Sequence, residues 1–457
     1  MKSRRQFLGS MAGLTSAGVA TGLGMYSLDS LSAVQSGYKA VVVIHLNGGN
    51  DANDVLVPLD GAYGDYSKAR PSIALKKDMI QAFSGAQLGH SMGLNSAMTS
   101  LMPLYNSGRL AFMVNAGALI KPTTAAEVLN GKATLPPFLF SHPEQTQYVQ
   151  GWMGDEDPSG WGGRAIEAMD TQRTFKAPLI SINSNEFTSV LGKMSRVVNA
   201  DPNGSKFIGR ADLTNGDNRW TQILESLTRF QSQTNVEAEY ARTFKGAFGD
   251  AKELARADGM AQEPTGNFAN NDIAKKLRYT AKIIPFYKAI GATRQVFHVQ
   301  WGSFDTHVNQ RYTSVMSGNA NQDTQLSELA NAMAAFDQSM IAAGLGKDVT
   351  VLVMSEFGRT LDPAAGMGSD HAWGSHWMVM GSAVNGGRFY GDKFPSLVLG
   401  GVDDSHNQKR GYWVPQISGD QVVSDLMTWL GLPSDKLIQV MPNLANFAKK
   451  NVGFMNG

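Results

Sequence analysis

Side chains that bind metals are concentrated in one stretch of the chain, SEFGRTLDPAAGMGSDHAWGSH, which runs from Ser355 to His376. It carries Glu356, the adjacent pair Asp370 and His371, and His376, although the whole chain has only 8 histidines. Carboxylate oxygen and imidazole nitrogen together suit Zn, Mn, Fe or Mg-type ions. Because the chain has no cysteine, a thiolate metal site is excluded. These residues are therefore candidate ligands of a divalent ion.

Two shorter motifs carry further candidate ligands. Asp51 ends the motif LNGGND, and the motif FDTH contains Asp305 and His307. Asp305 and His307 are two residues apart, so in an extended segment they would point to one side and could hold one ion, or they could hydrogen-bond each other. Asp51 could instead cap the helix that follows, and Glu356 could instead be the buried ion-pair partner of Arg359. Taken together, the motifs favour a metal site.

The pair Ser141-His142 indicates a different kind of chemistry. It stands where a helix could begin, and a hydroxyl at a helix start gains backbone donors and the helix dipole. That position would suit the attacking hydroxyl for a phosphate or sulfate ester, although Ser141 could simply cap the helix. His45 and His298 lie within apolar runs and are interpreted as core histidines.

Apolar runs of strand length indicate the elements that position these residues. Nearly continuous apolar runs that end in turns are typical of central parallel strands. Five such runs are residues 40–46, 109–117, 177–183, 294–302 and 348–358, and two weaker ones are 376–381 and 396–401. Ligands in open α/β sheets gather beyond the carboxyl ends of the strands. Since Asp51, Asp305 and Glu356 each follow a different run, we expect them at one rim of a sheet.

A helix is predicted between the last two strong runs. Leu326, Leu329, Met333, Phe336 and Met340 recur at spacings of three and four. Strand, helix and strand in this order imply a right-handed parallel crossover. The alternation repeats along the chain, so we predict a three-layer α/β/α fold with a mostly parallel central sheet. The chain has no Walker A loop, G-x-G-x-x-G fingerprint or H-E-x-x-H motif, which removes the usual support for nucleotide binding and zincin chemistry.

A helical insertion is predicted from about residue 205 to residue 285. A stripe of apolar residues from Trp220 to Phe230 has helical spacing, and the segment that follows is rich in helix-forming residues. The insertion could be plain structural cover of the sheet, or it could carry a surface for a protein partner. We place it within a single domain that spans residues 34–457.

The N-terminus has the character of an export signal. The sequence SRRQFL matches the twin-arginine pattern, and residues 11–28 are too polar and Gly-rich for a confident membrane span. Residues 1–33 are therefore predicted to be a signal peptide that directs the folded protein through the twin-arginine translocase to the periplasm or another exported location. The net charge of +1 gives no electrostatic case for nucleic-acid binding.

The order of the motifs adds a family resemblance. Behind a twin-arginine leader, LNGGND, SHPEQTQ, FDTH, SEFGRT and SDHAWGSH resemble the DUF1501 family of exported bacterial proteins, which is similar to the alkaline phosphatase and sulfatase superfamily. That superfamily uses two metals at the carboxyl rim of a parallel sheet. The resemblance implies that Asp51 is a bridging aspartate, that Asp305, His307 and His371 hold one metal, and that Ser141 is the hydroxyl nucleophile.

One pair departs from the superfamily pattern. Glu356-Phe357 stands where the superfamily usually has Asp-His, and phenylalanine cannot bind a metal. A second metal would thus lose a ligand, unless His376 or Asp370 substitutes. We expect one or two divalent ions, with Zn or Mn favoured.

Two functions follow from these expectations. The first is an exported metal-dependent hydrolase of phosphate or sulfate esters, small or polymeric, in which Ser141 attacks and a metal or Arg359 holds the non-bridging oxygens. The second is a non-catalytic binding or assembly protein on the same fold, with a structural or vestigial metal site, and Phe357 favours it.

Overall fold

A central β-sheet is the framework of the computed structural model, which describes residues 37–204, 218–229, 234–311 and 321–456. Within these residues the sheet has nine strands. Its middle strand, β1 (Lys39–Leu46), pairs in parallel with β8 (Arg294–Trp301) on one side and with β9 (Val349–Ser355) on the other. Beyond β8 the parallel pairing continues through β6 (Leu179–Ile182) to β7 (Val198–Ala200). The predicted signal peptide lies outside the described residues.

The sheet changes direction on the other side of β9. There β10 (Ser375–Met380) runs antiparallel to β9 and to β5 (Leu110–Gly117). The short strands β11 (Arg388–Tyr390) and β12 (Ile417–Ser418) pair in parallel with β5. The sheet is therefore mostly parallel, as predicted. Because β10 is antiparallel, the start of β10 lies at the same rim as the end of β9.

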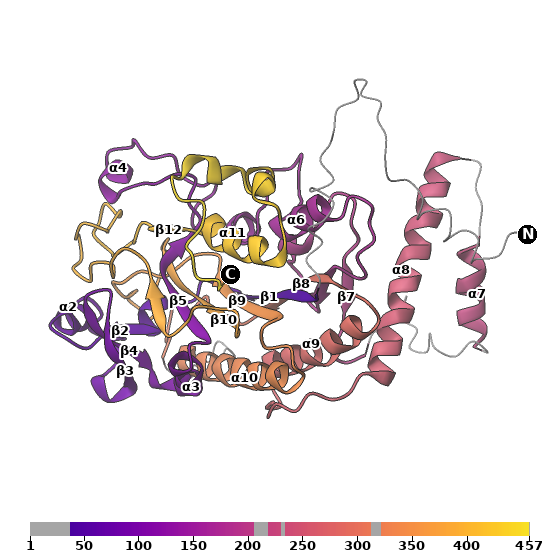
Figure 1. The fold of residues 1–457 in the computed structure, drawn as a ribbon. Helices are drawn as coiled ribbons and strands as arrows, with labels where there is room; N and C mark the ends of the chain where they lie inside the picture. The colour runs from indigo at the N-terminus through magenta and orange to yellow at the C-terminus, as the bar shows by residue number, and fades with distance from the viewer. Residues whose placement is uncertain (1–36, 205–217, 230–233, 312–320, 457) are drawn as a thin grey trace, which may run out of the picture. The chain divides into compact units, whose positions relative to one another are not determined.

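Helices cover both faces of the sheet and complete the three predicted layers (Figure 1). Side chains alternate between the faces of a strand, so the even-numbered apolar residues of β1 enter one core and the odd-numbered Val41 and Val43 enter the other. The first core is closed by α9 (Asp272–Ala289) and α10 (Gln322–Ala342). The second is closed by α6 (Trp161–Met169) and α11 (Gly419–Leu430).

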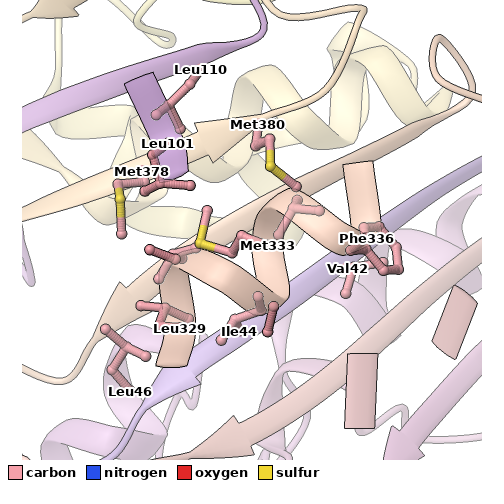
Figure 2. Close-up of a cluster of buried hydrophobic side chains, with 14 of the residues drawn as sticks. Val42, Ile44, Leu46, Leu101, Leu110, Leu329, Met333, Phe336, Met378 and Met380 are labelled. Atoms are coloured by element: carbon pink, nitrogen blue, oxygen red, sulfur yellow. The ribbon is translucent and has the colours of Figure 1, made fainter. Parts of the chain in front are cut away.

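The predicted crossover helix is confirmed as α10. Its Asn321 cap accepts a hydrogen bond from the Thr324 amide, as expected of a helix start. Figure 2 shows Leu329, Met333 and Phe336 of α10 beside the apolar side chains of β1, and all are buried. This packing ties the α10 layer to the strand that ends at the candidate site.

A second, three-stranded antiparallel sheet was not predicted. It consists of β2 (Leu56–Pro58), β4 (His90–Asn95) and β3 (Ile80–Gln87). The segment Gly89–Gly93 matches the G-x-S-x-G pattern of serine hydrolases, but it lies in the β3–β4 hairpin rather than at a strand-to-helix turn, so it lacks the context of a nucleophile elbow. Nearby helices are α2 (Ala62–Ala69) and α3 (Met102–Asn106).

The weak strand predicted at residues 396–401 is wrong. The segment is a surface loop in which the Val398 side chain is 51% exposed. Side-chain carboxylates hold its backbone in place of a strand ladder, because Asp403 accepts from the Ser396 amide and Asp404 accepts from the Gly400 amide.

The described part of the predicted insertion is helical. It contains α7 (Arg219–Leu227), α8 (Asn235–Met260) and α9, and Leu224 of α7 packs with Phe248 of α8. The stretches 205–217 and 230–233 lie outside the described residues. Elsewhere in the described chain are α4 (Ala125–Leu129), α5 (His142–Val149) and α12 (Leu437–Val440), with 3₁₀ turns at Ala52–Asp54, Lys77–Met79, Ser96–Leu101, Thr188–Val190, Ser434–Lys436 and Pro442–Asn446. Among the residues described, none of the helices combines the length and apolar character that a membrane crossing requires.

Candidate metal centre

Four segments bring metal-type side chains together at the carboxyl rim of the sheet. Asp305 follows β8, Glu356 follows β9, His371 precedes the antiparallel β10, and His142 is the first residue of α5. The rim predicted from the strand ends is therefore where these residues meet. Its fourth member, His142, arrives from a helix rather than from a strand end.

The Nε2 atoms of three histidines converge on one carboxylate oxygen. The Nε2 atoms of His142 and His371 each lie 3.3 Å from Asp305 Oδ1 and 3.1 Å from each other. These three residues form a group whose ligand atoms all lie within 4.8 Å of one another. His307 stands beside them, with its Nε2 3.0 Å from Asp305 Oδ1 and 3.0 Å from His371 Nε2.

The Nδ1 atom of each of these three imidazoles lies within hydrogen-bond distance of an acceptor. His142 Nδ1 lies 2.7 Å from Glu356 Oε1, and His307 Nδ1 lies 2.7 Å from Asp370 Oδ1. His371 Nδ1 lies 2.8 Å from the carbonyl oxygen of Phe140. Outer partners of this kind orient the histidine ligands of metal ions and set their tautomer.

The donor set fits a cation. A carbonyl oxygen can only accept a hydrogen bond, so His371 carries a proton on Nδ1 and, when neutral, presents a lone pair at Nε2. The same tautomer at His142 and His307 directs lone pairs at the Asp305 carboxylate. Neutral imidazoles of this tautomer would face the carboxylate with no proton between them, so the cluster requires positive charge at its centre, either a proton on an imidazole Nε2 or a bound cation. Two or three imidazoles with one carboxylate suit a divalent transition metal.

Charge in the cluster shifts its pKa values. Burial lowers the pKa of His142, but hydrogen bonds to Asp305 and Glu356 outweigh it and raise that pKa to about 9. Desolvation raises the pKa of Asp305, yet hydrogen bonds from His142, His371 and Arg359 hold it far below the ordinary range for a carboxyl group. The centre is therefore one where a carboxylate stays ionised and attracts positive charge.

The cluster is open on one side and closed behind. The side chains of Asp305 and His307 are 44% and 43% exposed, whereas those of Glu356 and Arg359 are fully buried. A structural metal site is usually closed by protein ligands, and a catalytic one keeps a position open to water or substrate. The exposure of Asp305 and His307 leaves one side of the cluster accessible to solvent.

Backbone contacts within the stretch from Ser355 to His376 bring His371 to the rim. The Gly358 amide donates to the Trp373 carbonyl at 3.0 Å, and the Ala372 amide donates to the Gly358 carbonyl at 2.9 Å. A Cβ on Gly358 would lie 2.1 Å from the Gly374 carbonyl oxygen, so only glycine permits this close pairing. The stretch therefore folds back on itself to present His371 beside the end of β9.

The buried ring of Phe357 forms the wall behind two of the imidazoles. Its centroid lies 4.7 Å from that of His142 and 4.8 Å from that of His371. The ring cannot supply a ligand, but it restricts both imidazoles to the orientation in which their Nε2 atoms meet at Asp305.

The structure divides the predicted ligands into three groups. Asp305, His307 and His371 lie in the cluster, and Glu356 and Asp370 lie directly behind it as partners of imidazoles. The third group contains the predicted ligands whose described contacts lie elsewhere.

Asp51 belongs to that third group. Its carboxylate makes a buried ion pair with Arg70 and accepts hydrogen bonds from Asn53 at 2.7 Å and from Gln310 at 2.6 Å. The Asn53 amide also donates to it, so Asp51 caps the short helical turn that follows β1. This is the capping alternative that the sequence left open.

His376 also lies away from the cluster. It is inside β10, where its Nδ1 accepts the Asn115 amide at 3.1 Å and its ring stacks on Trp413. Burial lowers its pKa to about 3, so the imidazole is neutral. The structure does not bring it to the rim because the strand directs its side chain into the protein.

The two residues predicted to act on substrate have partners of their own. Ser141 is the residue before α5, and its hydroxyl donates to the Glu144 carboxylate rather than capping the helix. The buried guanidinium of Arg359 donates to carbonyl oxygens of Gly48, Gly49 and Ser369 and to Asp305 Oδ1, the last at 2.5 Å. Arg359 therefore holds the loops and the central carboxylate together.

His142 is a candidate ligand that sequence reasoning missed. Its position beside Ser141 marked the segment as a possible reaction site, but no spacing linked it to Glu356, which is 214 residues away. The available signal was a histidine at a helix start next to a candidate nucleophile.

Comparison with known proteins identifies the family. A family model described as "Protein of unknown function (DUF1501)" matches residues 38–397. The chain belongs to the DUF1501 family. This confirms the resemblance found in the motifs, and a search of the curated proteins gives no match.

Several solved structures are similar to the DUF1501 chain. A protein in the alkaline phosphatase superfamily from Vibrio parahaemolyticus has 9% identity and a TM-score of 0.34, covering 78% of this chain, which spans 62% of that protein's length. The C-terminal periplasmic domain of EptC from Escherichia coli, in complex with Zn, has 10% identity and a TM-score of 0.36, covering 88% of this chain and 84% of that one. The sulfatase FucS1 from Pseudoalteromonas sp. has 13% identity and a TM-score of 0.33, covering 89% and 74%.

Proposed function

We propose that this DUF1501 protein is an exported, metal-dependent hydrolase of phosphate or sulfate esters. The observation that carries the proposal is the open cluster in which the Nε2 atoms of His142 and His371 meet Asp305 Oδ1, each imidazole being held from behind. Such a donor set holds an ion strongly, and its exposure leaves room for a substrate oxygen. The substrate is a small or polymeric ester with an anionic group.

Four residues of the cluster have a proposed role in binding the ion. His142, Asp305 and His371, with His307 beside them, would hold one divalent ion, for which Zn or Mn is favoured. An ion bound there would supply Lewis-acid chemistry toward an ester oxygen. We propose a single ion because Asp51, which was expected to bridge the first ion to a second one, is instead paired with Arg70.

Ser141 remains the proposed nucleophile. It stands at the start of α5, next to the ligand His142, and the N-terminus of a helix favours an anionic group. Its hydroxyl proton is directed to the Glu144 carboxylate, which is the acceptor for that proton when the oxygen attacks. Arg359 would act through Asp305, whose carboxylate it holds, in place of the predicted contact with substrate oxygens.

Metal content is the first test of this proposal. Protein purified without chelator or affinity-tag metal should carry close to one equivalent of metal by elemental mass spectrometry. His371→Ala should lose that metal, and His90→Ala should retain it, because His90 pairs with Asp60 on the three-stranded sheet. Protein that takes up neither Zn nor Mn would rule out the hydrolase.

Turnover separates the hydrolase from its alternative. With metal bound, Ser141→Ala should keep the ion and lose hydrolysis of aryl phosphates or sulfates. The alternative, a binding or assembly protein with a structural metal, is favoured by the buried partners of Asp51 and Arg359. It would show stoichiometric metal, a lower Tm after metal removal, and no turnover in a broad ester screen.

A further inference from the structure

A row of polar side chains is buried on one face of the sheet, behind the metal centre. Glu356 follows β9, His45 lies on β1 and His298 lies on β8, and these strands are neighbours. Val41 and Val43 enter the apolar core on that face, so the alternation along β1 directs His45 the same way. Both histidines have no exposed surface, which is unusual for polar side chains without a role.

The two buried histidines differ in their partners. His298 Nδ1 lies 2.8 Å from the Ser189 hydroxyl, which accounts for one of its nitrogens. Neither nitrogen of His45 has a hydrogen-bond partner among the described protein atoms. Its Nε2 lies 3.7 Å from Glu356 Oε2. That separation is longer than a direct hydrogen bond, but it keeps the imidazole in close electrostatic contact with the carboxylate.

Glu356 therefore lies between two imidazoles. Its Oε1 accepts from His142 Nδ1 at 2.7 Å and from the Gly48 amide at 2.8 Å. Its Oε2 accepts from the Ser355 hydroxyl at 2.9 Å and faces His45. A carboxylate that turned away from this arrangement would release Nδ1 of His142, and with it the tautomer that directs Nε2 at Asp305.

We propose that His45 is a positioning residue for the metal centre. Its imidazole lies against Glu356 Oε2 and holds that oxygen in place, so that Oε1 stays where it accepts the Nδ1–H of His142. The inference rests on the proposed function in one respect, because His142 matters there as a ligand. A histidine that only filled space in the core would have no effect on the centre once the space was filled by another side chain.

Two variants of similar size separate these roles. Gln and Met have nearly the same length and flexibility, and only Gln carries a polar amide. His45→Met should weaken Zn²⁺ affinity by about tenfold or more, as loss of an outer partner does, and His45→Gln should stay within about threefold of the wild type. His298→Met is the matched control, since it is equally buried on the same face and is not bonded to Glu356. It should leave the affinity within about threefold.

Competition of metal-free protein with a chromogenic chelator for Zn²⁺ measures these affinities. Equal affinities for wild type and His45→Met would overturn the proposal, as would an equal loss in His298→Met, which would indicate general damage to the core. Should His45→Met not fold, His45→Leu takes its place: an affinity about tenfold below that of the wild type supports the proposal, and an affinity equal to that of the wild type overturns it.

Crystal structures of the metal-free variants provide a readout that does not depend on the ion. The contact between Glu356 Oε1 and His142 Nδ1 should be lost in His45→Met and kept in His298→Met and His45→Gln. If the wild type bound no metal, the proposed function would fail, and this comparison would still decide the role of His45. If His45→Met retained the contact between Glu356 Oε1 and His142 Nδ1, that result alone would contradict the inference.

Discussion

Phe357 shows how one residue changes what the centre can hold. An imidazole at this position could have contributed to a second metal, as the superfamily resemblance expects. The phenyl ring instead packs against His142 and His371, with centroid separations of 4.7 Å and 4.8 Å. The donors that remain are directed at a single point around Asp305. Phe357 therefore supplies no metal donor and instead restricts the orientation of two candidate ligands.

The protonation of His142 predicts how metal affinity depends on pH. In the metal-free protein its pKa is raised from 6.5 to about 9, because hydrogen bonds to Asp305 and Glu356 outweigh the effect of burial. An ion must displace that proton, so Zn²⁺ affinity should rise by about tenfold for each pH unit up to about pH 9 and then level off. Titration with a competing chelator between pH 6 and pH 10 measures this profile.

The raised pKa of His142 also makes the stability of the metal-free protein fall as pH rises, opposite in direction to the metal affinity. A raised pKa means that the proton stabilises the folded state fully below the unfolded value of 6.5, and that this stabilisation is lost as pH rises through about 9. Metal-free protein should thus lose stability over this window while its affinity for metal increases. His142→Gln, which cannot titrate, should flatten both profiles, and unchanged profiles in that variant would assign the proton to another group.

At the scale of the elements, the turn after β1 decides where Asp305 lies. Gly48 has φ +105°, and a Cβ there would lie 2.5 Å from the Asp305 amide nitrogen. Gly48→Ala should therefore displace the β8 loop, destabilise the protein by about 1–3 kcal/mol and weaken metal binding. Urea unfolding and zinc titration measure both effects.

Gly64 provides the matched control for this prediction. It lies in α2, and a Cβ there would have no neighbour within 4 Å. Gly64→Ala should stabilise the protein by about 0.5–1 kcal/mol because alanine is the better helix former. Equal effects of the two substitutions would mean that the close approach at Gly48 does not constrain the site.

Elements buried on both faces were predictable from the sequence, and short or surface elements were not. Strands such as β1 have continuous apolar runs because helices cover both of their faces, and α10 has a complete apolar stripe. The three-residue β2 is too short to show a period. The direction of β10 could not be read from its composition, because an apolar run has the same appearance in either orientation.

Only part of the candidate site could be predicted from the sequence. Ligands that follow strand ends, such as Asp305, could be placed at one rim because parallel strands share an edge. Asp51 satisfied the same pattern, yet it is bound by Arg70, a partner that no local spacing reveals. His376 stays apart from the cluster because, within β10, its side chain is directed to a face of the sheet, where it stacks on Trp413.

At the scale of the whole molecule, the leader predicted at residues 1–33 leads to a test of export. Replacing both arginines of the SRRQFL motif, Arg4→Lys with Arg5→Lys, should retain the protein in the cytoplasm, because the twin-arginine translocase recognises that pair. Cell fractionation with immunoblotting measures the distribution. Unchanged export of the double variant would mean that another route carries the protein.

The wide separation of the ligands along the chain has a consequence for the order of assembly. His142 reaches Glu356 across 214 residues, and His371 reaches Asp305 across 66. Contacts between such distant segments form only when the strands between them are paired. An unfolded chain therefore keeps Asp305 and His307 close but separates them from His142 and His371, and the complete donor set forms only after the sheet has closed. Binding of an ion by the complete donor set would thus report that the strands adjoining the cluster had paired.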